Sequence, residues 1–247
     1  MSVKLKILFM KNFKQTIFLF LFLSFIFSSG FTGCKELTSL TMTEGEVARG
    51  LKEALTIGAV NAVLATNKQD GFFQNPLIKI PFPEEAQGAM NFMHNSTLLR
   101  PLLNEFVLRL NRAAENAAEK AKPIFAEAIT GITIHDAWGI LRGGDGSATR
   151  YLKEKTYNSL TAAFKQDILN SLQAVGAQST WAELTSAYNN LALINPNLTK
   201  INTDLADYTT RKALDGLFKM VEQEENKIRK DPVARVTDLL RRVFAQQ

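Results

Sequence analysis

Apolar residues recur at helical spacing through most of the chain after residue 46, and long strictly alternating runs are missing. Val47, Leu51 and Leu55 share one helical face, and Thr43 with Glu46 forms a capping-box pattern in front of them. A second stripe turns alanine-rich, which would let another helix approach closely: Leu103, Phe106, Leu110, Ala114, Ala117 and Ala121. The pattern predicts an all-α fold, a single bundle-like domain of about eight or nine helices over residues 47–247.

Local signals predict where several of these helices begin and end. Pro123 should kink or restart the alanine-rich helix, because it removes a backbone donor. Thr133 and Asp136 are placed to cap a short helix, which the Gly-Gly-Asp-Gly run at 143–146 would end. Ser147 could then cap the next helix. We interpret the glycine run as this helix stop rather than as a phosphate-binding loop, because no Gly-Lys-Ser/Thr follows it.

Asp231 followed by Pro232 is the preferred entry into a helix, and it predicts the last helix of the domain. The apolar positions expected to line that helix are Val233, Val236, Leu239, Leu240 and Val243. Arg229 and Arg235 would flank its N-terminus, so Arg229, Asp231 and Arg235 form a candidate anion or interaction site. A capped helix junction with a structural ion pair explains the same residues more simply.

The segment 71–83 has no helical period and contains three prolines and three phenylalanines. Pro81 and Pro83 would restrict any strand here to a sheet edge. Two interpretations remain open. Phe72, Phe73 and Phe82 could form a hydrophobic flap over a groove, or the segment could be an extended connector whose rings fill the helical core. The second is the more economical.

Residues 1–33 have the organisation of a bacterial lipoprotein signal peptide. Basic residues precede an apolar run at 17–27, and small residues lead to Gly33 and Cys34. The run is shorter than the roughly 20 apolar residues of a spanning helix. We therefore predict cleavage after Gly33, a lipid on Cys34, and a short tether over 34–46. Cleavage elsewhere, with Cys34 a free thiol, is the alternative.

The predicted lipid would hold the protein on a membrane, since two or three acyl chains suffice for stable anchoring. Lys35 follows the cysteine where the best-known inner-membrane retention signal has Asp. The expected location is the bacterial envelope, with the protein on the outer membrane facing the periplasm. Either Met1 or Met10 could be the true start, because Lys11 and Lys14 alone would give a sufficient basic region.

The composition of the chain argues against several classes of function. The net charge of +5 falls to +1 when residues 1–33 and their four lysines are removed, which argues against nucleic-acid binding. One cysteine and two histidines give no basis for a metal centre or a cofactor. His135 beside Asp136, and His94, could act as bases, but we interpret both histidines as surface residues. The acidic run at 222–225 suggests salt bridges on a helix rather than paired catalytic carboxylates.

Four segments carry a resemblance to a known family: GFFQNPLIKIPFPEE (71–85), NRAAENAAEKAKPIF (111–125), the glycine-containing stretch 137–149, and ALDGLFKMVEQEENKIRKDPVARVTDLLRRVF (213–244). In this order they resemble the uncharacterised bacterial lipoprotein family called domain of unknown function 4197, over about 47–244. The resemblance implies a helical, often lipid-anchored protein, and it implies no activity.

Three functions are therefore open. The first, which we favour, is a non-catalytic envelope scaffold or interaction protein with protein partners. The second is a carrier of a hydrophobic ligand in an inter-helical cavity beneath the 71–83 segment. The third and weakest is a carboxylate-based hydrolase, which would need acidic side chains to converge with a histidine in a cleft.

Overall fold

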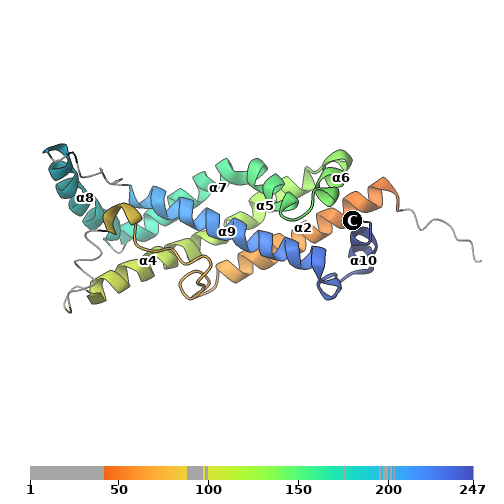
Figure 1. Cartoon of the computed structure of the whole chain (residues 1–247), viewed down its shortest axis with the longest axis horizontal. Helices are drawn as coiled ribbons and strands as arrows, with labels where there is room; N and C mark the ends of the chain where they lie inside the picture. Colours follow the sequence, from red (N-terminus) through yellow and green to blue (C-terminus); the bar gives the residue numbers. More distant parts are fainter. Residues whose placement is uncertain are drawn as a thin grey trace, which may run out of the picture. The chain divides into compact units, whose positions relative to one another are not determined.

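The computed structural model describes residues 42–87, 97, 100–174, 176–194, 196, 200, 202 and 204–246. The predicted signal peptide, Gly33, Cys34 and His94 lie outside these residues. Residues 43–247 form one compact unit. Its described part is helical, which confirms the predicted all-α fold (Figure 1).

The described residues contain eight α-helices and two short 3₁₀ turns. They are α2 (Glu44–Thr66), α4 (Arg100–Ala118), α5 (Ala121–Thr130), α6 (Ile134–Arg142), α7 (Ser147–Ala174), α8 (Ala177–Ile194), α9 (Leu205–Lys230) and α10 (Asp238–Phe244), with η1 (Glu84–Ala86) and η2 (Pro232–Ala234). None of these helices is long and apolar enough to cross a bilayer.

The long helix α9 organises the bundle. It packs along both α7 and α2, and α2 in turn packs against α5, α6 and α10 (Figure 1). The core contains Leu51 from α2, Phe164 from α7 and Leu217 from α9, all buried. The alanine stripe of α4 is also buried, and α4 lies against α7 as expected for a face of small residues.

Both predicted capping boxes are present. The Thr43 hydroxyl accepts from the Glu46 amide, and the Glu46 carboxylate accepts from the Thr43 amide. The same reciprocal bonds join Thr133 and Asp136 at the start of α6. Because α2 begins at Glu44, residues 43–46 belong to the folded unit as well as to the predicted tether. Pro123 lies in the first turn of α5, where the helix restarts.

The last helix differs from its prediction. Asp231 caps only the three-residue turn η2, and α10 begins seven residues later, at Asp238, with Thr237 as its cap. Thr237 supplies a cap hydroxyl of its own, which accepts from the Leu240 amide at 3.2 Å. Val233 and Val236 therefore point to solvent instead of lining a helix.

Candidate functional site

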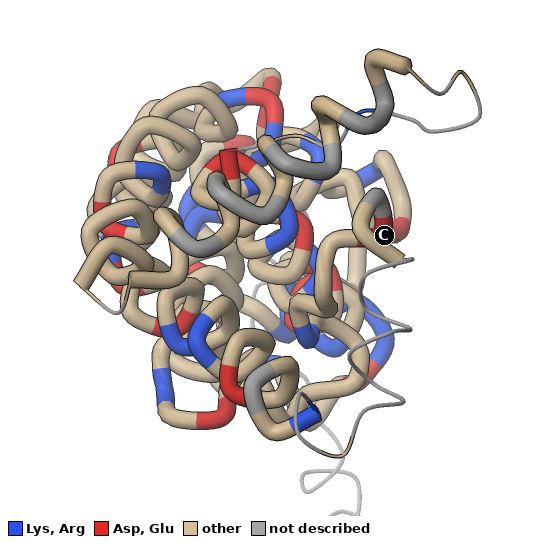
Figure 2. Tube along the Cα trace, turned by 90° about the vertical axis from the view of Figure 1, so that its left-hand side faces the viewer, with Lys and Arg blue, Asp and Glu red and all other residues tan. Residues whose placement is uncertain are grey.

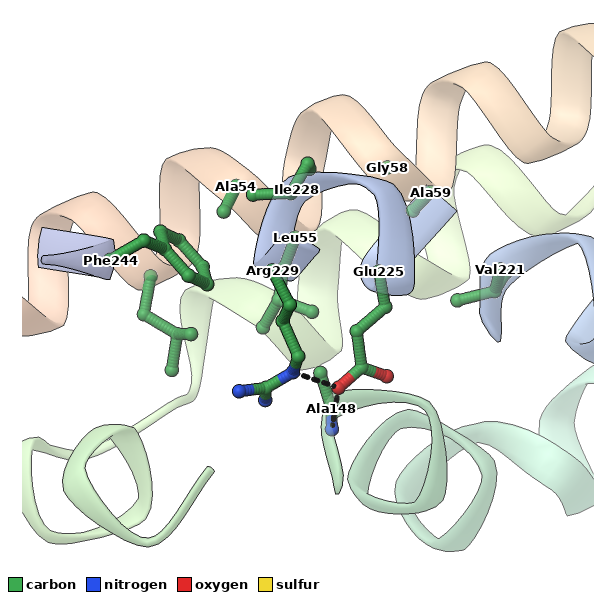
Figure 3. Close-up of a pocket in the computed structure, with 11 residues that line it drawn as sticks. Ala54, Leu55, Gly58, Ala59, Ala148, Val221, Glu225, Ile228, Arg229 and Phe244 are labelled. Carbon is green, nitrogen blue, oxygen red and sulfur yellow. Dashed lines mark hydrogen bonds and ion pairs between the residues drawn. The ribbon is translucent and has the colours of Figure 1, made fainter. Parts of the chain in front are cut away.

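A buried ion pair lies at the centre of the most polar part of the core. Glu225 and Arg229 are one turn apart on α9, and Arg229 Nε donates to Glu225 Oε1 at 2.9 Å (Figure 3). Their side chains are only 6% and 3% exposed. A charged pair buried this deeply needs further hydrogen bonds to offset the loss of hydration.

The Glu225 carboxylate obtains those bonds from the start of α7. It accepts from the backbone amides of Ala148 at 3.0 Å and Thr149 at 2.9 Å, and from the Thr149 hydroxyl at 2.8 Å. These amides are among the donors that a helix start leaves without a partner inside the helix. A negative charge at this position also complements the positive end of the helix dipole.

The Arg229 guanidinium donates hydrogen bonds to the last carbonyl groups of α6. Its Nη1 and Nη2 atoms donate to the carbonyl oxygens of Leu141 at 3.0 Å and Ile140 at 2.8 Å. Nη2 also donates to the Ser147 hydroxyl at 2.6 Å, and that hydroxyl donates to the Ile140 carbonyl. One ion pair on α9 thus satisfies both helix ends at the α6–α7 junction. We call Glu225, Arg229 and Ser147 the junction clasp.

The clasp explains the glycine run at 143–146. Gly144 and Gly146 have φ angles of 73° and 71°, which side chains rarely adopt, so the chain can reverse between α6 and α7. Ser147 is the first residue of α7 and bonds Arg229 and the Ile140 carbonyl, rather than capping the helix from outside as predicted. The run is therefore a helix junction in the structure, as its sequence indicated.

A narrow cavity of about 20 Å³ lies beside the clasp, with room for about one water molecule. Apolar side chains from α2, α9 and α10 form most of its wall, among them Leu55, Val221 and Phe244 (Figure 3). Glu225 and Arg229 also line this cavity, so the ion pair lies beside mainly apolar side chains. The clasp can hold α6, α7 and α9 in register. The hydrogen-bond partners of Glu225 and Arg229 described above all belong to the protein itself.

The predicted anion site of Arg229, Asp231 and Arg235 is brought together at the end of α9. Its donors are directed to backbone carbonyls: Arg235 Nε donates to Ile228 at 3.0 Å, and its Nη2 donates to Arg229 at 2.7 Å. The Asp231 carboxylate accepts from the Val233 amide at 2.9 Å. The geometry is that of a capped helix junction, in which Glu225, and not Asp231, is the ion-pair partner of Arg229.

A second polar group fixes the 71–83 segment to α4. Asn111 pairs with the backbone of Ile80 through two bonds of 2.8 Å, one donated in each direction. The Glu115 carboxylate accepts from the amides of Phe72 and Phe73, both at 3.1 Å. Arg112 bridges Glu115 to Asp70. These contacts of α4 therefore join a helix to an irregular segment.

The three candidate flap residues have different positions. Phe72 is fully buried against Gly216 of α9, and Phe82 is 5% exposed and packs against Phe106 and Trp181. Phe73 is half-buried, with the Lys79 ammonium 4.2 Å from the centre of its ring. Two rings thus fill the core, and one lies at the surface.

An open groove lies along the outer side of this segment, between it and the first turns of α4. It has a volume of about 740 Å³ and is lined by Phe73, Pro76, Lys79, Pro81, Phe82, Leu103, Asn104 and Val107. That volume lies within the range of small-molecule sites. Sequence reasoning assigned Leu103 to the core and did not identify Val107, although their spacing of four places them on one face of α4.

The histidine next to Asp136 does not form a catalytic pair in the described structure. His135 is exposed, and the Asp136 carboxylate is bonded to the amide and hydroxyl of Thr133. Those two bonds lower the pKa of Asp136. Asp136 and Tyr151 both line an adjacent cleft, where burial and the negative charge of Asp136 raise the pKa of Tyr151.

Charges of both signs are interspersed around the bundle (Figure 2). Among the residues that the structure describes, no three His, Cys, Asp or Glu side chains gather closely enough to hold a metal ion.

Comparison with known proteins identifies the family. Residues 41–245 match the family described as protein of unknown function (DUF4197). The chain belongs to this family. The match confirms the resemblance seen in the sequence, and the DUF4197 region includes the junction clasp, the 71–83 segment and the groove. No curated protein and no solved structure matches the chain.

Proposed function

We propose that this DUF4197 protein is a lipid-anchored, non-catalytic protein of the bacterial envelope, which acts as a scaffold through contacts of its helical domain. The anchor is inferred from the basic and apolar regions before Gly33 and from Cys34. On this proposal, residues 1–33 are removed, and the folded unit from Thr43 onward follows a short tether on the periplasmic side of the outer membrane.

The junction clasp is the observation that supports a non-catalytic role in this proposal. A catalytic acid or base needs a proton that it can exchange with substrate in a cleft. Glu225 and Arg229 instead use their bonds to close the ends of two helices, and Glu115 and Arg112 use theirs to fix the 71–83 segment. These buried charges support a rigid body whose surface makes the contacts.

Metabolic labelling with an alkyne analogue of palmitate tests the anchor. We expect label on the wild-type protein in the membrane fraction and none on a Cys34→Ala variant. The Cys34→Ser variant controls for the loss of side-chain volume at the cleavage site. Label that persists on both variants would contradict the assignment of Cys34.

Photo-crosslinking tests the scaffold role. A photoreactive amino acid replaces Leu77, which is 62% exposed, and in a second variant it replaces the buried Leu160 as a control. We expect the Leu77 position to give a discrete crosslink to an envelope protein in cells. The proposal would be contradicted if no crosslink formed at Leu77 or at other exposed apolar positions such as Leu64.

The groove supports a second candidate, a carrier of a hydrophobic ligand. Its volume would accommodate an acyl chain, and Phe73, Phe82 and Leu103 supply apolar wall. Native mass spectrometry of residues 43–247 tests it, and a stoichiometric apolar adduct lost on denaturation is the supporting result. Val107→Gln should abolish the adduct, whereas Val60→Gln, on the exposed face of α2, should not. A bare mass for the wild-type protein would contradict the carrier function.

A further inference from the structure

The loop between α9 and α10 presents two apolar side chains to solvent. Val233 is 85% exposed and Val236 is 63% exposed, in the segment 231–237, which we call the tip loop. Isolated exposed apolar residues are common on protein surfaces. Here two of them lie on one short loop, and clustered exposed apolar groups often mark a contact surface.

The tip loop is held in this exposed shape by its own polar bonds. The Asp231 carboxylate fixes the Val233 amide, and Arg235 donates to the last carbonyls of α9 at Ile228 and Arg229. Arg241 of α10 donates in turn to the Arg235 carbonyl at 2.9 Å. The residues predicted to bind an anion therefore stiffen a loop that keeps both valines directed away from the bundle.

The tip loop lies at the end of the folded unit where its chain begins. α10, which follows the loop directly, packs on the first turns of α2 (Figure 1). A Cβ at Gly50 of α2 would lie only 2.4 Å from Val243 Cγ2, so the two helices are in close contact. Arg242 of α10 also pairs with Glu46 of α2 at 3.3 Å.

We propose that the tip loop rests on the lipid headgroups of the membrane that carries the anchor, an inference that depends on the proposed acylation of Cys34. Thr43 follows Cys34 by nine positions, and an extended chain covers at most about 3.6 Å per residue. The anchor would thus hold the start of α2 within roughly 30 Å of the bilayer, and the tip loop belongs to the same end of the unit.

Four cations lie in or beside the tip loop: Lys230, Arg235, Arg241 and Arg242. The carboxylates near them are Asp231 and Asp238, together with Asp145, which pairs with Lys230, and Glu46, which pairs with Arg242. The pairs that Lys230 and Arg241 form with acidic side chains are exposed to solvent, and such pairs are weak. Lys230 can therefore turn to a lipid phosphate while the valines enter the interface between headgroups and acyl chains.

Lipid-dependent quenching of a fluorophore tests the contact. Residues 43–247 contain no cysteine and have their own core, so Val233→Cys gives a single labelling site. The labelled protein is held by an N-terminal hexahistidine tag on vesicles of phosphatidylethanolamine and phosphatidylglycerol that contain a nickel-chelating lipid. Leu193→Cys is the matched control, because Leu193 is 67% exposed on α8, at the other end of the unit (Figure 1).

We expect headgroup spin-labelled lipid to quench the label at 233 at least about threefold more than the label at 193. Adding Val236→Asp should reduce quenching at 233 to the level of the control, since a buried charge opposes insertion. Adding Ile194→Asp to the control should change nothing. Equal quenching at the two sites would overturn the proposal.

A response of the label at 233 to protein concentration without vesicles would also overturn it, by showing a contact between two copies of the chain. Because the tag replaces the acyl anchor, a negative result refutes only the tip-loop contact. The separate labelling experiment on Cys34 decides the anchor.

Discussion

Removing the positive half of the junction clasp should destabilise the protein severely. Arg229→Met deletes the bond to Glu225, the bonds to the Ile140 and Leu141 carbonyls, and the bond to Ser147. It also leaves a carboxylate that is 6% exposed without its counterion. Breaking a buried pair from one side costs about 3–5 kcal/mol, and we expect a loss of this size in the free energy of unfolding.

A control on the same helix separates this effect from loss of charge. Lys219 pairs with Glu222 one turn away, but both side chains are substantially exposed, so Lys219→Met should cost less than about 1 kcal/mol. Arg229→Lys keeps the positive charge and loses the planar fork that reaches several acceptors. Its stability should therefore fall between those of the wild type and Arg229→Met.

Urea unfolding of residues 43–247, followed by circular dichroism, is the assay. The comparison requires a single transition with an unchanged slope in each variant. A loss below about 1 kcal/mol for Arg229→Met, equal to that of the Lys219 control, would refute the reasoning. It would show that the clasp is not a major part of the stability of the fold.

Three further predictions concern packing, a buried amide and pH. Gly216→Ala should cost about 1–3 kcal/mol, because a Cβ there would lie 2.7 Å from an aromatic ring of the core. Asn111→Ala leaves a buried backbone amide and carbonyl of the 71–83 segment unpaired, and should cost about 2–3 kcal/mol in urea unfolding. Asp136 has a lowered pKa because of its bonds from Thr133, so its contribution to stability is present above about pH 4 and is lost as the pH falls through the folded-state pKa. The melting temperature should accordingly fall less steeply in acid for Asp136→Asn than for the wild type.

Each of these predictions has a matched comparison. Gly139→Ala places a methyl group in open space on α6 and should stabilise by up to about 1 kcal/mol. Asn104→Ala removes an exposed amide from the same helix as Asn111 and should be nearly neutral. Equal losses within either pair would contradict the packing argument or the hydrogen-bond argument. Parallel acid profiles for wild type and Asp136→Asn would contradict the assigned role of that carboxylate.

Local signals were sufficient to predict the helical fold and its best-defined boundaries. The capping boxes at Thr43 and Thr133 involve residues three apart, so their partners can be read directly from the sequence. The start of the last helix could not be predicted in this way. Asp231 and Pro232 do begin a helical turn, but that turn ends at once because Arg235 donates to the Ile228 carbonyl at the end of α9. The Thr237 hydroxyl then caps the start of α10.

The candidate sites depended on contacts between distant parts of the chain. Glu225 bonds Thr149, 76 residues away, and Asn111 bonds Ile80, 31 residues away. No spacing rule connects such pairs, because each depends on how helices pack. The sequence identified Arg229 as a candidate site residue, and the structure was needed to show which groups Arg229 and Asn111 bind.

The intact mass of the protein extracted from bacterial membranes tests the central claim most directly. We expect a chain that begins at Cys34 and carries the added mass of a diacylglycerol and an amide-linked acyl chain on that residue. A chain that begins elsewhere, or one that begins at Cys34 with an unmodified thiol, would contradict the lipid anchor and the functions proposed from it.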